Sequence, residues 1–239
     1  MTAATISRIV VLGLALTVLG SASAQAESSA SLDPQGRILV VGDAGSNDIT
    51  ISDQSNPACP GGPPCYEITS GNEGTTATPP CVVISPTPSQ GDVLCPRAGV
   101  TGITGVGREG SDRMWISDFV FGLGVPASLD GGPGYDELSG SIGNDTLIGG
   151  VDNDVLRGGG GLDHLDGNPG EDRLFGAKGV DVLNGGPGND DVFGGLGNDN
   201  LEGGSGKDLL DGLQGRKDRC NGGGGKDVGR RCERRIAIP

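Results

Sequence analysis

The chain has 239 residues, of which 48 are glycine and only 3% are aromatic. A helix interior disfavours glycine by about 1 kcal/mol relative to alanine, so this composition excludes a fold of long amphipathic helices. The scarcity of large apolar side chains also argues against a conventional globular core. Acidic residues outnumber basic ones by 31 to 17, and the net charge of −14 disfavours nucleic acid as a partner and favours metal cations.

Residues 1–26 are typical of a secretory signal peptide. Arg8 supplies a positive charge, an uncharged apolar run extends from Ile9 to Leu19, and small residues at A-x-A spacing follow up to Ala26. A single membrane anchor is the alternative, but the apolar run is shorter than the about 20 residues needed to cross a bilayer. The sequence therefore predicts a secreted, extracellular protein without a transmembrane anchor.

The six cysteines agree with export, because an even number of cysteines in an exported chain favours disulfides. Their spacing favours three local pairs, which are Cys59–Cys65, Cys81–Cys95 and Cys220–Cys232. A zinc site is the alternative. It is disfavoured because no paired C-x-x-C occurs and the single histidine, His164, is far away in the sequence.

Residues 27–130 form a β-rich N-terminal region. We expect strands over residues 37–41, 49–51, 100–106 and 113–121. Residues 57–96 hold nine of the 15 prolines and four of the six cysteines, so this insertion is too rich in proline for the interior of a sheet. The region is either a β-rich cap with disulfide-pinned loops or a binding module of unrecognised type.

Nine consecutive nine-residue units run from Gly131 to Asp211. Position 1 is glycine in all nine, and position 4 is glycine in all but one, where Asp152 stands. Position 8 is aliphatic throughout, at Leu138, Leu147, Leu156, Leu165, Leu174, Leu183, Val192, Leu201 and Leu210. Position 6 is aspartate throughout, at Asp136, Asp145, Asp154, Asp163, Asp172, Asp181, Asp190, Asp199 and Asp208.

These units resemble the RTX, or hemolysin-type, calcium-binding nonapeptide repeat G-G-x-G-x-D-x-U-x. The resemblance implies an all-β fold, a right-handed parallel β-roll or β-solenoid. In this fold a six-residue Gly-Asp turn precedes a three-residue strand, and two repeats make one coil. The resemblance also implies that several Ca²⁺ ions lie between turns stacked on the same edge of the roll.

The residue types support the same chemistry. Glycine at positions 1 and 4 permits positive φ and close backbone approach, so a turn can direct several carbonyl oxygens inward. The aspartate adds a hard anionic oxygen, and such oxygens are what Ca²⁺ takes in proteins. The nine position-6 aspartates are therefore the predicted metal ligands. Only the middle residue of each short strand faces the interior, which explains the aliphatic position 8 and the variable positions 7 and 9.

Charge couples folding to the metal. Residues 131–211 contain 16 acidic and four basic residues, a net charge of −12. Stacked aspartates repel each other without a counter-ion, so we expect folding and calcium binding to be one process. A flexible, acidic, glycine-rich linker is the alternative, and it is the state expected without calcium.

Degenerate units flank the strict array, which we assign to the roll over residues 131–229. Weaker turns or caps are expected around Asp48, Asp112, Asp218 and Asp227. Residues 230–239 form a basic tail with Arg230, Arg231, Arg234 and Arg235. This tail either caps the open end of the roll, pinned by Cys220–Cys232, or attracts an anionic cell-surface polymer.

No catalytic motif is recognised, because the chain contains neither H-E-x-x-H nor G-x-S-x-G, and His164 occupies an outward position 7. The sequence predicts a secreted calcium-binding protein with a structural or interaction role and no enzyme activity. The alternatives are a secreted enzyme with an unrecognised active site in residues 27–130 and a surface adhesin that uses the roll as a scaffold. Phe175 and Phe193, both at position 9 and one coil apart, are expected to stack.

Overall fold

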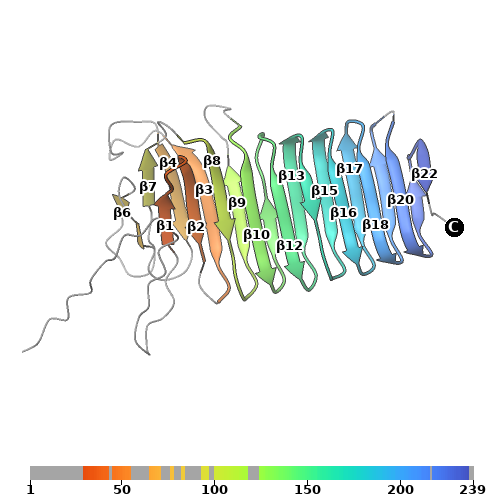
Figure 1. Cartoon of the computed structure of the whole chain (residues 1–239), viewed down its shortest axis with the longest axis horizontal. Coiled ribbons are helices and arrows are strands. Elements are labelled where there is room, and N and C mark those ends of the chain that lie inside the picture. Colours follow the sequence, from red (N-terminus) through yellow and green to blue (C-terminus); the bar gives the residue numbers. More distant parts are fainter. Residues whose placement is uncertain are drawn as a thin grey trace, which may run out of the picture.

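The computed structural model describes residues 29–42, 45–54, 65–70, 76–77, 82–83, 93–96, 100–117, 124–215 and 217–236. The expected signal peptide and the expected pairs Cys59–Cys65 and Cys81–Cys95 lie outside the described residues or side chains. All regular secondary structure in the described residues is β-strand, arranged as two 11-stranded sheets. The strands follow one another along the long axis of an elongated molecule (Figure 1). No described segment forms a helix of the length and apolarity that crossing a membrane requires.

We call the two layers sheet A and sheet B. Sheet A contains β1 (Ser29–Leu32), β2 (Arg37–Val41), β5 (Thr76–Ala77), β8 (Gly102–Val106), β10 (Ala127–Pro133), β12 (Thr146–Val151), β14 (His164–Asp166), β16 (Val182–Pro187), β18 (Asn200–Gly206), β20 (Arg219–Gly225) and β22 (Arg234–Ile236). Sheet B contains β3 (Asp48–Gln54), β4 (Cys65–Ser70), β6 (Val82–Val83), β7 (Val93–Pro96), β9 (Arg113–Ser117), β11 (Glu137–Ser139), β13 (Val155–Gly161), β15 (Arg173–Gly179), β17 (Asp191–Leu196), β19 (Leu209–Leu213) and β21 (Val228–Arg230).

From β8 onwards the chain alternates between the two sheets, and each strand pairs in parallel with the strand one coil later. In sheet A, Leu129 lies beside Leu147, and in sheet B, Leu138 lies beside Leu156. The offset of 18 residues corresponds to two nonapeptides per coil. The predicted all-β roll of parallel stacked coils is therefore confirmed.

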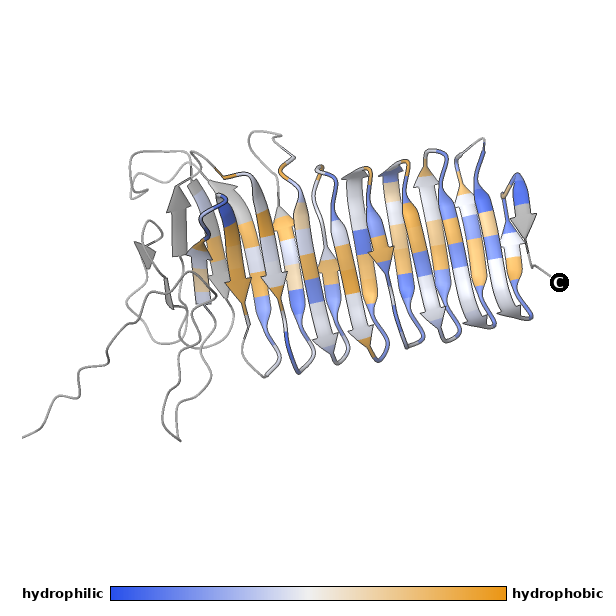
Figure 2. Ribbon diagram, viewed as in Figure 1, coloured by the Kyte–Doolittle hydropathy of each residue, from blue (hydrophilic) through white to orange (hydrophobic). Residues whose placement is uncertain are grey.

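The core is a ladder of aliphatic side chains between the sheets. All nine predicted position-8 residues are fully buried, and Leu138, Leu174 and Leu210 each have 0% exposure. These positions form an apolar band across the strands (Figure 2). Cys220 continues the ladder beside Leu201, which shows that a half-cystine takes the place of an aliphatic residue near the C-terminal end.

The solenoid extends upstream of the strict repeats. In sheet A, β2, β8 and β10 pair in parallel, and in sheet B, β3, β9 and β11 do the same. Strand β10 runs through the expected boundary at residue 131 without a break. In sheet B, Ile49 and Met114 take the core position that leucines occupy downstream, whereas in sheet A the buried Ile38 and Ile103 lie in register with Ala127. The N-terminal region is thus β-rich, and the described strands join the same two sheets.

The two ends of the stack are built differently. At the N-terminal end, antiparallel pairing brings β1 onto β2 and β4 onto β3. At the C-terminal end, β22 pairs in parallel with β20, and the predicted Cys220–Cys232 disulfide is present with a Cα–Cα distance of 5.8 Å. The side chain of Arg231 forms two hydrogen bonds with the buried carboxylate of Asp211. The described part of the basic tail therefore packs against the last coils.

Candidate metal centre

The turn geometry differs in two ways from the expected one. Positive φ occurs at positions 2 and 4 rather than at positions 1 and 4, as at Gly132 (100°) and Gly134 (139°). Position 2 also accommodates non-glycine residues, since Ala177 has a φ of 79°. The strands run on into the turns, so β12 has six residues rather than three. Asp152, which replaces the position-4 glycine, adopts a φ of 79° and so keeps the left-handed turn.

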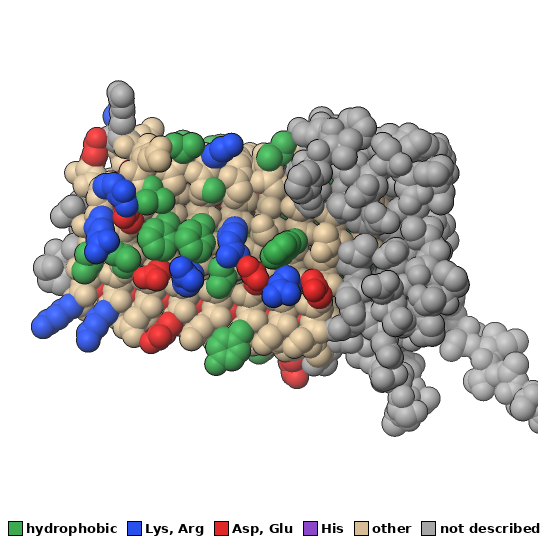
Figure 3. Space-filling model, turned by 180° about the vertical axis from the view of Figure 1, so that it is seen from behind, with side chains coloured by type: hydrophobic (Ala, Val, Ile, Leu, Met, Phe, Trp, Pro, Cys, Tyr) green, Lys and Arg blue, Asp and Glu red, His purple; other side chains and the backbone are tan. Residues whose placement is uncertain are grey.

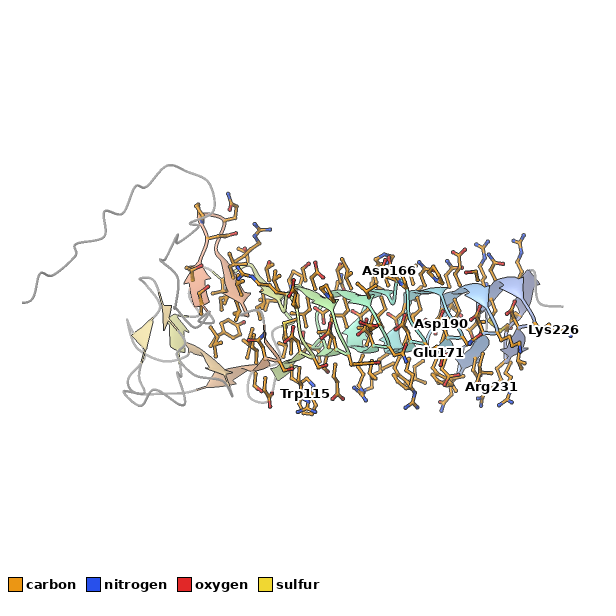
Figure 4. The ribbon with its side chains drawn as sticks, turned by 90° about the horizontal axis from the view of Figure 1, so that it is seen from below. Trp115, Asp166, Glu171, Asp190, Lys226 and Arg231 are labelled. Carbon is orange, nitrogen blue, oxygen red and sulfur yellow. A yellow bond between two sulfur atoms is a disulfide. The ribbon has the colours of Figure 1, made fainter. Side chains whose placement is uncertain are left out.

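The position-6 aspartates stack in two columns, one on each edge where the chain crosses between the sheets. Column I, on the turns from sheet A to sheet B, contains Asp112, Asp136, Asp154, Asp172, Asp190, Asp208 and Asp227. Column II, on the turns from sheet B to sheet A, contains Asp145, Asp163, Asp181, Asp199 and Asp218. Figure 4 shows Asp190 between the two layers of strands, whereas Trp115 lies outside them.

Within a column, each carboxylate is held by the preceding coil through one of its oxygens. The backbone N–H of Asp172 donates to Oδ1 of Asp190 at 2.9 Å, and the same contact recurs between Asp163 and Asp181 at 3.0 Å. The second oxygen, Oδ2, is buried and receives no hydrogen bond from any described group in ten aspartates, namely Asp136, Asp154, Asp163, Asp172, Asp181, Asp190, Asp199, Asp208, Asp218 and Asp227. A buried carboxylate oxygen without a donor is costly unless a cation satisfies it.

Six of these Oδ2 atoms share the space beside a position-1 glycine with a carbonyl oxygen of the next coil, namely those of Asp136, Asp154, Asp172, Asp181, Asp190 and Asp218. A Cβ atom built on Gly185 would lie 2.5 Å from Oδ2 of Asp190 and 2.6 Å from the carbonyl oxygen of Gly203. Both oxygens are acceptors, so they repel each other unless a positive charge lies between them. Glycine at position 1 is therefore required because a side chain would fill the space that these two oxygens share.

The electrostatics of the columns favour a bound cation. Burial is the largest cause that raises the pKa of eight of the column aspartates, and neighbouring carboxylates add to it for most of these eight. The pKa rises to about 8 for Asp154, to about 7 for Asp136, Asp163 and Asp190, and to about 6 for Asp172 and Asp199. The hydrogen bond from the preceding coil opposes this rise in each case. The columns therefore hold negative charge at neutral pH only at an energetic cost that a cation would remove.

The donor set suits calcium. The described residues contain no cluster of three or more His, Cys, Asp or Glu side chains placed to hold one metal ion. An ion between two turns would therefore be held mainly by backbone carbonyls together with Asp Oδ2 atoms, and Ca²⁺ takes six to eight such oxygen ligands. Cys220 and Cys232 are bonded to each other and so do not supply the thiolates of a zinc site.

Asp145 differs from the other predicted ligands. Its Oδ2 accepts a hydrogen bond from the backbone N–H of Ser141 at 2.6 Å, within its own turn. Ser141 is at position 2 but does not adopt the positive φ of most position-2 residues. Asp145 thus belongs to column II, while its second oxygen is already satisfied by the protein.

The structure also places three acids that the strict repeat misses. Asp112, Asp218 and Asp227 continue the columns beyond the nine units, with spacings of 24, 19 and 19 residues to their neighbours in place of 18. At the N-terminal end of column I the acid position is taken by Asn47 and not by Asp48, which lies at the start of β3 and pairs with Arg113 at 3.7 Å. Burial shows which of the two residues belongs to the column, since Asn47 is 2% exposed and the Asp48 side chain is 55% exposed.

The outer face of sheet B carries a row of aromatic and charged side chains. Phe175 and Phe193 stack as predicted, with ring centroids 5.1 Å apart. The guanidinium groups of Arg157 and Arg173 each lie 5.7 Å from the Phe175 ring. In Figure 3 the hydrophobic side chains on this side of the molecule lie next to basic and acidic ones. His164 is exposed on the outside of β14, as expected for position 7.

Comparison with known proteins identifies the repeats. Residues 128–156, 148–183, 184–216 and 193–228 match the RTX calcium-binding nonapeptide repeat. No curated protein and no solved structure was found that matches the chain. The matched segments cover both columns from Asp136 to Asp227, whereas Asn47 and Asp112 lie upstream of them. Residues 128–228 of this chain are RTX calcium-binding nonapeptide repeats that form a β-solenoid.

Proposed function

We propose that this chain is a secreted protein whose repeats bind several Ca²⁺ ions between stacked turns and fold as they bind them. The observation that carries the proposal is the set of ten buried Asp Oδ2 atoms that receive no hydrogen bond from a described group. The nine position-6 aspartates predicted from the sequence are its proposed ligands, with Asp145 the least dependent on metal. Asp218 and Asp227 join them, because they present the same buried oxygen.

The ions would stabilise the fold by removing repulsion along the columns. Asp190 is fixed through Oδ1 by the preceding coil, and its Oδ2 shares the space beside Gly185 with a carbonyl oxygen of the following coil. The bound ion supplies positive charge between these oxygens. The chain supplies the rest, since the position-1 glycine leaves the space and the left-handed positions 2 and 4 turn the backbone.

Export is supported by two features. Residues 1–26 have the pattern of a signal peptide. The Cys220–Cys232 disulfide suits an oxidising compartment, and extracellular calcium is abundant enough for modules that bind it in the range of about 10⁻⁴–10⁻³ M. We infer that the protein folds after it leaves the cell.

The fold best supports a structural role or a role in binding a partner. The described strands of the N-terminal region join the solenoid and extend it. The contact between Arg231 and Asp211 supports the tail as a cap of the last coil, in preference to a site for an anionic cell-surface polymer.

A calcium titration tests this function. The purified chain, stripped of metal, is followed by far-ultraviolet circular dichroism and by hydrodynamic radius while Ca²⁺ or Mg²⁺ is added. We expect a cooperative gain of β signal and a decrease in radius with Ca²⁺, and a much weaker response to Mg²⁺, which demands a rigid octahedral site. A chain that is equally folded in chelator would contradict the proposal.

A further inference from the structure

Asn47 occupies the acid position of the first coil in column I. Its backbone N–H donates to Oδ1 of Asp112 at 2.6 Å, as the N–H of Asp112 donates to Oδ1 of Asp136 at 2.7 Å. Its carbonyl accepts a hydrogen bond from the N–H of Arg113 at 2.6 Å, the contact that every aspartate of the column before the last makes with the next strand. Asn47 is therefore the first member of column I, although its side chain is a neutral amide.

The side-chain nitrogen of Asn47 donates hydrogen bonds at the position where the later aspartates have an Oδ2 atom without a donor among the described groups. Nδ2 is 2.7 Å from the carbonyl oxygen of Gly45, 2.9 Å from Oδ1 of Asp112 and 3.4 Å from the carbonyl oxygen of Gly107. Because these three partners are all acceptors, the atom that faces them must be the NH₂ nitrogen.

In the later coils, the space beside the position-1 glycine lies between two hydrogen-bond acceptors. A Cβ atom built on Gly42 would lie 2.6 Å from Asn47 Nδ2 and 2.7 Å from the carbonyl oxygen of Gly107. The equivalent pair beside Gly185 is a carboxylate oxygen and a carbonyl oxygen. The first coil thus replaces a repulsive pair of oxygens with a hydrogen bond.

We propose that the carboxamide of Asn47 takes the place of a calcium ion at the head of column I, so that the first coil is joined to the second without metal. The inference rests on the proposed calcium function of the later coils. It sets where the row of ions begins, which is after Asn47, between the turns that carry Asp112 and Asp136. The first coil then offers a preformed edge on which the calcium-dependent coils assemble.

At the N-terminal end of column II, a backbone N–H takes the role that the Asn47 amide has in column I. The N–H of Ser141 donates to Oδ2 of Asp145. In the other aspartates of column II, this oxygen has no donor among the described groups and is the proposed calcium ligand. One coil earlier, the acid position is held by Ala127, whose N–H donates to Oδ1 of Asp145 at 2.7 Å. Both columns therefore end towards the N-terminus at an N–H group that occupies the place of the cation.

The decisive variant is Asn47→Asp, which restores the acid that the repeat pattern calls for. A hollow of about 460 Å³ beside this turn is lined in part by Asn47, Asp112 and Asp136. The matched control is Asn153→Asp, which adds the same charge at an exposed residue of a neighbouring turn. Asn153 accepts a hydrogen bond from the N–H of Glu171 through Oδ1, and an aspartate would still accept it.

Bound calcium is counted by equilibrium dialysis of the full chain with radioactive Ca²⁺, and the thermal midpoint is measured at limiting and at saturating Ca²⁺. We expect Asn47→Asp to bind one more ion per chain than the wild type and Asn153→Asp to bind none extra. At limiting calcium Asn47→Asp should melt at a lower temperature than the wild type, and saturating calcium should restore it. Asn47→Ala removes the amide without supplying a ligand, so calcium should not restore that variant.

The outcomes separate this inference from the proposed function. A wild-type chain that binds no calcium would remove the proposed function. A wild-type chain that binds calcium, together with an Asn47→Asp chain that binds the same number of ions or fails to fold at saturating calcium, would overturn the role of Asn47.

Discussion

Asp172 donates its backbone N–H to Oδ1 of Asp190 at 2.9 Å, while its own Oδ1 accepts the N–H of Asp154 at 2.7 Å. Each carboxylate is therefore fixed to the coil before it and faces the coil after it. Because neighbouring sites share the same backbone, we expect the loss of one ion to affect the sites on both sides of it in the column.

Asp172→Asn should weaken calcium binding more than Asp227→Asn. Asp172 has column neighbours on both sides, whereas Asp227 has a described aspartate neighbour on one side only. We expect at least about a tenfold loss of affinity, or ~1.4 kcal/mol, for Asp172→Asn, with lower cooperativity. Glu171→Gln is the control, because it removes the same charge from an exposed side chain next in sequence. Equal shifts for the two aspartate variants would contradict the idea.

Gly176→Ala should block one site while leaving the backbone conformation allowed. The new methyl group would lie 2.6 Å from both Oδ2 of Asp181 and the carbonyl oxygen of Gly194. We expect the variant to bind at least one ion fewer and to need more calcium to fold. Gly224→Ala is the matched control, since its Cβ atom would meet no atom within 4 Å. Isothermal titration calorimetry gives the number of bound ions in both variants. Equal numbers would contradict this location of the ion.

Protons should partly replace calcium in the metal-free chain. Burial raises the pKa of Asp154 from 3.8 to about 8 and that of Asp190 to about 7. A group with a raised pKa in the folded state takes up a proton on folding. Its contribution to stability is complete below the unfolded pKa and is lost as the pH rises through the folded pKa. Metal-stripped protein should therefore show more β signal at about pH 5.5 than at about pH 7.5. Circular dichroism at the two values checks this, and equal spectra would refute it.

Replacing both Phe175 and Phe193 with serine should weaken calcium-driven folding. The rings stack 5.1 Å apart on sheet B and are half-buried, so the pair contributes about 1 kcal/mol beyond its buried area. We expect the calcium midpoint of folding to rise. Leu196→Ser, at an exposed position, serves as the control. An unchanged midpoint would leave the pair as a candidate patch for a partner instead of a stabilising ladder.

Removing residues 230–239 should weaken calcium-driven folding and promote self-association. The deletion removes Arg231, whose side chain covers Asp211 and holds the pKa of that carboxyl below its usual value. It also exposes the last coil as an open edge. Cys220→Ala is added to avoid an unpaired thiol, and the full chain with both Cys220→Ala and Cys232→Ala is the control. Intact folding with loss of binding to anionic vesicles or cell-wall material would favour the polymer-binding alternative.

Much of the fold follows from the period of the sequence. An aliphatic residue at every ninth position indicates which residue faces the core, and the 18-residue register in the sheets agrees with two repeats per coil. The ladder position of Phe175 and Phe193 followed from the same period. These features depend on local geometry that is repeated in every unit, so the sequence pattern predicts them many times over.

The parts that the sequence did not predict depend on contacts between distant residues. Asn47 lies 65 residues before its partner Asp112, and the irregular spacing of this coil pointed to Asp48 instead. Oδ2 of Asp145 accepts the N–H of Ser141, a position-2 residue without positive φ, and the repeat pattern does not encode that conformation. Position 2 was missed as a left-handed site because residues such as Ala177 tolerate that conformation there.

The regular stacking of the aspartates makes each column a line of charge. Parallel strands lie about 4.8 Å apart, so successive carboxylates are closer than the Debye length of about 8 Å at physiological ionic strength. Dissolved sodium chloride cannot screen neighbours at this spacing, and the column lies under the protein surface. The counter-charge must therefore enter the column itself. We therefore expect the fold of the protein to respond to the identity of the cation far more than to the total ionic strength.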